Sequence, residues 1–261
     1  MTAQELFDHF RSMGTWVNWN ATTDHFQIGD PATEVKAVAV AWQARLEALK
    51  KAHELGCNVF ITHEQFEYPE PQVAHKGEIQ PYEKAKRQFC EEHGLVVFRC
   101  HDVWDRVPHI GIVDAWAAHL GLTGPSAGNA MEAVHPAPVP TLRELAEYVL
   151  EKTKPLGQDG VEMIGDPDAK ITKVGIGCGA GTNYQKMVST GADAIIGTDD
   201  GMHFWSEGSW VLDKGIPLVL VTHTVAEEPG LKKLAEYIEK ELRIPATHIP
   251  LGSMYKLVGR S

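Results

Sequence analysis

The chain has 261 residues, 43% of them hydrophobic, which is enough for a sizeable core in one large domain or two small ones. Its formal net charge of −11 argues against nonspecific nucleic-acid binding, which needs a basic surface. No apolar run approaches the ~18 residues of a membrane span and the N-terminus does not read as a signal peptide, so we expect no membrane partner.

The first half of the chain predicts a helix followed by alternating strands and helices. Thr2 can cap a helix and Glu5, three residues on, can reach back to it, which is a capping box. A short β-rich run at 38–42 precedes a helix-like segment at 44–55. Two turn-and-strand segments follow, at 56–62 and 94–101.

The second half repeats this order. Thr141 and Glu144 repeat the helix-start signal. A β-rich run at 174–177 and a helix-like segment at 184–189 come next, and turn-and-strand segments at 191–197 and 215–223 complete the match. The pattern therefore predicts a duplication in which two similar halves are related by a pseudo-twofold axis.

Alternating strands and helices predict an α/β fold with mixed, mostly parallel sheets. We place the first α/β half at 1–121 and the second at 141–261, as one compact unit overall. The proline-rich stretch 122–140 reads as a linker and not as an element. Residues 246–257 are a candidate for an antiparallel edge strand.

The cysteines argue for a reducing cytoplasm and against a structural metal or disulfide framework. They are Cys57, Cys90, Cys100 and Cys178, which lie far apart with no C-x-x-C pair.

The most informative residues follow the predicted strands, because ligands in open α/β sheets bind beyond the carboxyl ends of the strands. All four strand exits carry imidazole, carboxylate or both. The residues are His63 and Glu64; His101, Asp102 and Asp105; Asp199, Asp200 and His203; and His223, Glu227 and Glu228.

Two of these exits share a spacing that suits metal binding. His101 and Asp105 are four residues apart, as are His223 and Glu227, so one helical turn places each pair on one face. We expect Pro108 and Pro229 to end these turns soon afterwards. Imidazole and carboxylate donors without thiolate suit Zn, Mn, Fe or Ni, and their number suits two ions that activate a bridging water.

Each of these residues also has a simpler interpretation. A single histidine is usually a surface or satisfied side chain, and Asp199-Asp200-Gly201 is equally a turn former. The glycine-rich stretch 175–181 meets no nucleotide fingerprint, and we favour a turn where backbone must approach backbone. Cys178 within it reads as a buried thiol and not as a nucleophile.

A zinc-protease motif at residues 63–67 is excluded, because Glu67 stands where the second histidine is needed.

Taken in order, these motifs resemble the GTP cyclohydrolase I type 2 family, also called NGG-interacting-factor-three-like proteins. The family pattern runs His-His-Pro after a strand, His-x-x-x-Asp, Gly-Glu followed by His, and Gly-His-x-x-x-Glu. The matching stretches are His63-Glu64-Gln65, His101 to Asp105, Gly197-Thr198-Asp199 with His203, and His223 to Glu227. An early element at 26–29 also matches, and the likeness runs over almost the whole chain.

The resemblance implies a duplicated α/β fold, a hexameric toroid and two metal ions per subunit. Carried over by position, His63, Asp105, His223 and Glu227 are implied ligands. Glu64 stands where the family has its second histidine, and a carboxylate there favours harder ions. Thr198 stands where the family has a glutamate, with Asp199 beside it as a substitute.

These observations predict a dinuclear metal-binding protein that hydrolyses a small nucleotide-like substrate. The expected metal ligands are His63, Glu64, His101, Asp105, His223 and Glu227, and they would hold two divalent ions. Water would attack a C=N or similar centre, with Glu64 or His203 carrying protons.

Two alternatives remain open, and with them the question of whether the chain is an enzyme. One is a non-catalytic metal-binding hexameric assembly or interaction protein. The other is an α/β binding module without metal, which predicts no stabilisation by added divalent ions.

Overall fold

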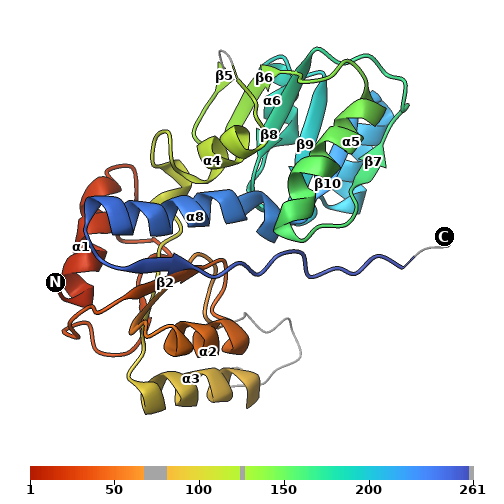
Figure 1. Cartoon of the computed structure of the whole chain (residues 1–261). Helices are drawn as coiled ribbons and strands as arrows, with labels where there is room; N and C mark the ends of the chain where they lie inside the picture. Colours follow the sequence, from red (N-terminus) through yellow and green to blue (C-terminus); the bar gives the residue numbers. More distant parts are fainter. Residues whose placement is uncertain (68–80, 124–126, 259–261) are drawn as a thin grey trace. The chain divides into compact units, whose positions relative to one another are not determined.

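The computed structural model describes residues 1–67, 81–123 and 127–258. The chain forms two compact units (Figure 1). Unit 1 comprises Met1–Trp104 and Leu231–Leu251, and unit 2 comprises Asp105–Gly230 and Gly252–Ser261. Each unit is built around its own mixed sheet.

The sheet of unit 1 has five strands in the order β1-β4-β3-β2-β11. The strands are β1 (Phe26–Ile28), β2 (Val38–Ala41), β3 (Val59–Thr62), β4 (Val96–Arg99) and β11 (Ala246–His248). β2, β3, β4 and β11 are parallel, and β1 is antiparallel to β4. Every residue of β2, β3 and β4 is buried, as expected for parallel strands covered on both faces.

Helices cover both faces of this sheet. α2 (Leu46–Glu54) and α3 (Pro81–His93) lie together on one face (Figure 1), where Leu49 and Cys90 join the core around Phe60. The other face is covered by α1 (Ala3–Met13), whose Phe10 packs edge-on against Trp104 with ring centroids 6.1 Å apart. Tyr237, in the last part of α8 (His223–Glu241), also contacts Phe10.

The sheet of unit 2 has six strands in the order β5-β6-β8-β9-β10-β7. β8 (Lys173–Gly177), β9 (Ala194–Thr198) and β10 (Leu218–Val221) are parallel and central. β5 (Ala127–Gly128), β6 (Glu132–Pro136) and β7 (Glu162–Ile164) pair antiparallel. The carboxyl ends of β9 and β10 are therefore level, with Thr198 opposite Val221.

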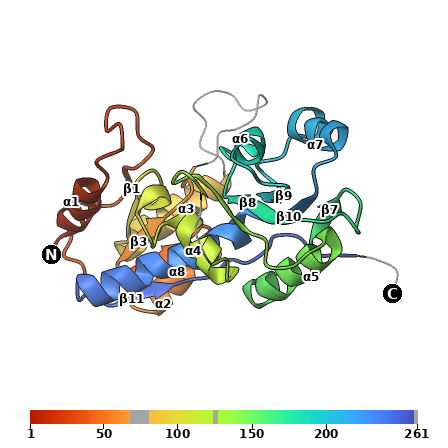
Figure 2. The same ribbon diagram turned by 90° about the horizontal axis from the view of Figure 1, so that it is seen from above.

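Figure 2 shows α6 (Tyr184–Ser189) and α7 (Ser209–Lys214) on one side of this sheet and α5 (Leu142–Thr153) on the other. α4 (Ile112–His119) contacts β8. The remaining turns are η1 (Trp104–Arg106), η2 (Lys154–Leu156) and the π-helix η3 (Phe204–Gly208). On the side of α6 and α7, the side chains of Tyr184, Met187 and Val211 pack in one hydrophobic core with Ile195 and Leu218 of the sheet.

The α/β fold class is confirmed, and both predicted helix starts form. Thr2 and Glu5 make the reciprocal capping box, and the Thr141 side chain accepts a hydrogen bond from the backbone of Glu144. In each sheet three parallel strands follow one another in the sequence. The pseudo-twofold duplication and the division into halves at 1–121 and 141–261 stay predictions.

Three local predictions were wrong. Residues 122–140 are not only a connection, because β6 lies within them and pairs with β8 along five residues. β11 is an edge strand as expected, but it is parallel to β2. Pro229 does not end a short turn. It lies inside α8, which is 19 residues long in total and runs on to Glu241, and it removes one backbone hydrogen bond without ending the helix.

All four cysteines are free and buried, as expected for Cys178 in particular. Among the described residues, no helix is both long and apolar enough to cross a membrane.

Candidate metal site

Unit 1 gathers three metal-donor side chains where β3 and β4 end. The two strands are parallel neighbours and Thr62 lies opposite Arg99, so the residues that follow them leave the sheet side by side. His63, Glu64 and His101 each place one donor atom so that all three atoms lie within 4.8 Å of one another. This spacing allows one ion to contact all three side chains.

The orientation of both imidazoles in this cluster is set by hydrogen bonds. His63 is buried, and its Nδ1 lies 3.2 Å from the carbonyl oxygen of Cys100, so Nδ1 donates a hydrogen bond and Nε2 is the nitrogen that can face an ion. The Nδ1 of His101 lies 3.0 Å from Oδ1 of Asp102. The two rings stack with centroids 4.5 Å apart. Such outer contacts are typical of metal-binding histidines.

Glu64 is held by Arg99, a charged residue at the end of a buried strand. The guanidinium donates to Oε2 of Glu64 at 2.9 Å and to the carbonyl oxygen of His63 at 2.7 Å. Burial alone would raise the pKa of Glu64, but a hydrogen bond with His101 and the charges of His63, His101 and Arg99 outweigh it and lower the pKa. The carboxylate is therefore ionised and fixed beside the two imidazoles.

Asp24 shapes the loop that carries His101. Its buried carboxylate accepts hydrogen bonds from the backbone N–H groups of His101, Asp102 and Val103 at 2.6 to 3.1 Å. Burial raises the pKa of Asp24, and the hydrogen bonds from His101 and Val103 act in the opposite direction. The sequence analysis missed both Asp24 and Arg99. A charge inside the otherwise apolar run VVFR was a usable signal for Arg99, whereas a single aspartate in a loop gives none.

Unit 2 carries a second donor group at the start of α8. His223 is the first residue of this helix, and its Nε2 lies 2.9 Å from Oε1 of Glu227, one turn later. Both side chains are buried. The predicted pairing of these two residues on one helical face is confirmed.

Asp199 and Asp200 position His223. The backbone N–H of His223 donates to Oδ1 of Asp199 at 2.7 Å, and its Nδ1 lies 3.1 Å from Oδ2 of Asp200. The ring of His223 therefore lies between two carboxylates, with Nδ1 toward Asp200 and Nε2 toward Glu227. These aspartates, which could equally have formed a plain turn, thus orient a candidate ligand.

The glycine-rich loop leaves room beside this group. A Cβ on Gly179 would lie 3.0 Å from Nε2 of His223 and 3.4 Å from Oε1 of Glu227, and the φ of Gly179 is +76°. Only glycine fits here without strain. The expected approach of backbone to backbone occurs at Gly201, where an added Cβ would lie 2.9 Å from the carbonyl oxygen of Gly179. The loop also lies against the side chains of the donor pair, which was not expected. The space is one that a bound ion can use, so the residues fit a metal.

Asp105 belongs to the same unit and lies near Cys178. Burial raises the pKa of the Cys178 thiol most, and the negative charges of Glu227 and Asp105 raise it further. Both carboxylates therefore lie near one buried sulfur.

His203 is placed differently from the other histidines. Its side chain is exposed and its Nδ1 lies 3.2 Å from Oε2 of Glu207 in η3. Within the described parts of the chain it joins neither donor group. A catalytic role of His203 stays a prediction.

Comparison with known proteins gives consistent matches. The sequence pattern of the family described as Duf34/NIF3 (NGG1p interacting factor 3) matches residues 10–251. A Chlamydia pneumoniae protein named "GTP cyclohydrolase 1 type 2 homolog" is 26% identical, with 98% of this chain and 100% of that protein covered. A protein of the same name from Clostridium acetobutylicum is 24% identical, with 86% and 84% covered.

Solved structures share the fold. The protein ybgI, described as of unknown function, has a TM-score of 0.80 at 19% identity, with 97% of this chain and 99% of that chain covered. Reduced HcgD from Methanocaldococcus jannaschii has a TM-score of 0.70 at 21% identity, with 95% and 97% covered.

Proposed function

Because the chain belongs to the Duf34/NIF3 family, we propose that it binds two divalent metal ions and hydrolyses a small nucleotide-like substrate. The observation that carries this proposal is the group formed by His63, Glu64 and His101, whose donor atoms lie within 4.8 Å of one another. The names of the curated relatives, "GTP cyclohydrolase 1 type 2 homolog", support the substrate class.

We propose that six predicted donors hold two ions in one dinuclear centre. They are His63, Glu64, His101, Asp105, His223 and Glu227. The 2.9 Å between Nε2 of His223 and Oε1 of Glu227 supports this, because one ion can contact both side chains. Imidazole and carboxylate donors favour Zn, Mn, Fe or Ni.

The ions would supply an activated water and polarise the substrate. The side chains of this protein would do the remaining work. Asp200 and the Cys100 carbonyl would orient the His223 and His63 rings so that each Nε2 can face a bound ion. Glu64, fixed by Arg99, is the candidate to accept a proton from the attacking water at the C=N centre, and His203 is a second candidate for proton transfer.

Thermal unfolding with and without divalent ions tests this function. A saturating ion at about 100 times its Kd adds about 2.7 kcal/mol, so we expect Zn²⁺ or Mn²⁺ to raise the Tm by about 5–10 °C. EDTA should reverse the shift and His223→Ala should abolish it. His53→Ala, which removes an exposed histidine on α2, is the matched control. An unchanged Tm with every ion would leave only the metal-free binding module.

A second candidate function is a non-catalytic hexameric assembly, and one surface feature favours it. The side chains of Phe204 and Trp205 are 74% and 80% exposed in η3, and exposed apolar groups of this size suit a subunit interface. Trp205→Asp should then reduce the molar mass measured by light scattering. A ring that binds metal but hydrolyses no nucleotide-like substrate would favour assembly over catalysis.

A further inference from the structure

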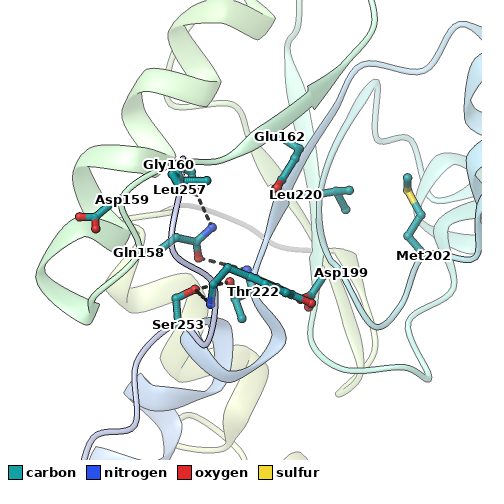
Figure 3. A pocket seen from close by; sticks show the side chains of 11 residues that line it. Gln158, Asp159, Gly160, Glu162, Asp199, Met202, Leu220, Thr222, Ser253 and Leu257 are labelled. Carbon is teal, nitrogen blue, oxygen red and sulfur yellow. Dashed lines mark hydrogen bonds between the residues drawn. The ribbon is translucent and has the colours of Figure 1, made fainter. Parts of the chain in front are cut away.

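Unit 2 contains a cavity of about 280 Å³ directly beside His223 (Figure 3). Thr222, the residue before His223, lines it, as does Asp199, whose Oδ1 accepts the backbone N–H of His223. Figure 3 shows Asp199 and Thr222 on one side of the cavity and Glu162 and Leu220 around it. A molecule in this cavity would therefore lie next to the candidate ligands of unit 2.

The C-terminal segment forms one wall of this cavity. Oγ of Ser253 lies 3.1 Å from Oγ1 of Thr222, and the backbone N–H of Gly252 donates to Glu228 at 3.2 Å. Leu257 packs so closely on Gly160 that a Cβ there would overlap it. The buried Gln158 supports this same wall, since its amide oxygen accepts from the backbone N–H of Thr222 and its amide nitrogen donates to the carbonyl oxygen of Gly160. The wall is thus built by specific contacts.

The lining of the cavity combines negative charge with apolar surface. Glu162 and Asp199 contribute carboxylates, while Leu220 and Met202 contribute apolar surface. The carboxylate of Asp159, another lining residue, points away from these side chains (Figure 3). Over the part of the chain that the structure describes, no lysine, arginine or histidine lines the cavity. The charge of Asp199, followed by burial, raises the pKa of Tyr255 on the C-terminal wall, as a negative environment does.

This lining discriminates between chemical groups. A phosphate would meet the carboxylates of Glu162 and Asp199 and no cation, which is unfavourable at close range. A planar group with adjacent N–H donors would instead find carboxylates that accept two hydrogen bonds side by side, and its flat faces would meet apolar side chains. The volume admits about one ring with a short substituent.

We propose that this cavity binds the amidine-type part of a small planar substrate, an N–C–N group with N–H donors that is neutral or positively charged, and excludes phosphate groups. The inference rests on the proposed function, because it names the substrate class of that same site. It places any phosphates of a nucleotide-like substrate outside this cavity.

Binding of benzamidine and benzoate to the EDTA-treated, metal-free protein tests the proposal, because the two probes share shape and differ in charge. Titration followed by NMR should show saturable binding of benzamidine and none of benzoate. Glu162→Gln should weaken benzamidine about fivefold, as the loss of one partly exposed charged contact does. Asp168→Asn, which neutralises an exposed carboxylate in the turn between β7 and β8, should leave it unchanged.

Three results would overturn the proposal: no saturable benzamidine binding, benzoate binding of similar strength, or equal effects of the two substitutions. Equal Tm values of the two variants confirm that both are folded. Because metal is absent, these outcomes are independent of the proposed function. Benzamidine binding by a protein that takes up no ions would preserve the cavity proposal and remove the metal-dependent hydrolase.

Discussion

Asp24 is the residue on which the shape of the His101 loop depends. Its truncation in Asp24→Ala would leave three backbone N–H groups without their acceptor in a buried position, at about 1–3 kcal/mol for each group that water cannot reach. We expect the free energy of unfolding to fall by about 3 kcal/mol or more, measured by urea denaturation. Asp8→Ala, at an exposed position of α1, should cost less than about 0.5 kcal/mol. Equal costs would contradict this role for Asp24.

Gly179 is predicted to be essential for metal binding by His223 and Glu227. Gly179→Ala would place a methyl group 3.0 Å from Nε2 of His223 at a positive φ, so we expect loss of metal and a destabilisation of about 1–2 kcal/mol. Gly181→Ala is the matched control, because a Cβ there meets no atom within 4 Å among the described residues. Metal content should be measured on both variants, and we expect it to fall in Gly179→Ala and not in Gly181→Ala. Full metal content in Gly179→Ala would refute the steric argument.

The sequence predicted the metal-donor residues better than the residues that position them by hydrogen bonds. His63, His101 and His223 could be picked out because each follows an apolar strand, and the i,i+4 relation of His223 and Glu227 follows from helix geometry. Asp24 and Arg99 act across the fold on residues 77 and 35 positions away, and no local pattern encodes such contacts. Asp199 and Asp200 also bind His223 by hydrogen bonds, and the sequence alone could not distinguish this role from that of turn formers.

Among the elements, α1 offers the cleanest test of a sequence signal. Thr2 and Glu5 satisfy each other's backbone N–H groups at the helix start. Thr2→Ala should lower the free energy of unfolding by about 1 kcal/mol, as loss of an N-cap does. Thr15→Ala, at an exposed position after the helix, is the control and should change it by less than about 0.5 kcal/mol in the same denaturation experiment. A loss as large in the control as in Thr2→Ala would contradict the capping account.

Predictions of helices and strands were confirmed where nearby residues determine the element, and they were wrong where pairing between distant strands determines it. α6 begins and ends as predicted, since Asn183 caps it and the run is short. β6 was missed because its register with β8 is a long-range property and its surroundings are rich in proline. The direction of β11 depends on the preceding helix α8, whose length was underestimated at Pro229, so the return of the chain parallel to β2 was not foreseen.

For the molecule as a whole, the four cysteines report on the integrity of both cores. All are buried, and burial raises the pKa of Cys57 and raises that of Cys90 to about 12, so their thiolates are scarce at pH 8. We expect less than one equivalent of iodoacetamide to react with native protein within minutes, and four equivalents in denaturant. Mass spectrometry identifies the labelled residues. Fast labelling of Cys178 in native protein would contradict its assignment as a buried thiol.

The central claim is that His63, Glu64, His101, Asp105, His223 and Glu227 are the ligands of one pair of ions, and metal counting by mass spectrometry tests it most directly. After dialysis against metal-free buffer, wild-type protein and the His53→Ala control should each retain two ions per chain, while His63→Ala and His223→Ala should each retain none. A wild-type protein without bound metal, or two ions left in either donor variant, would contradict the claim. One ion left in each donor variant would show two separate sites instead of a shared centre.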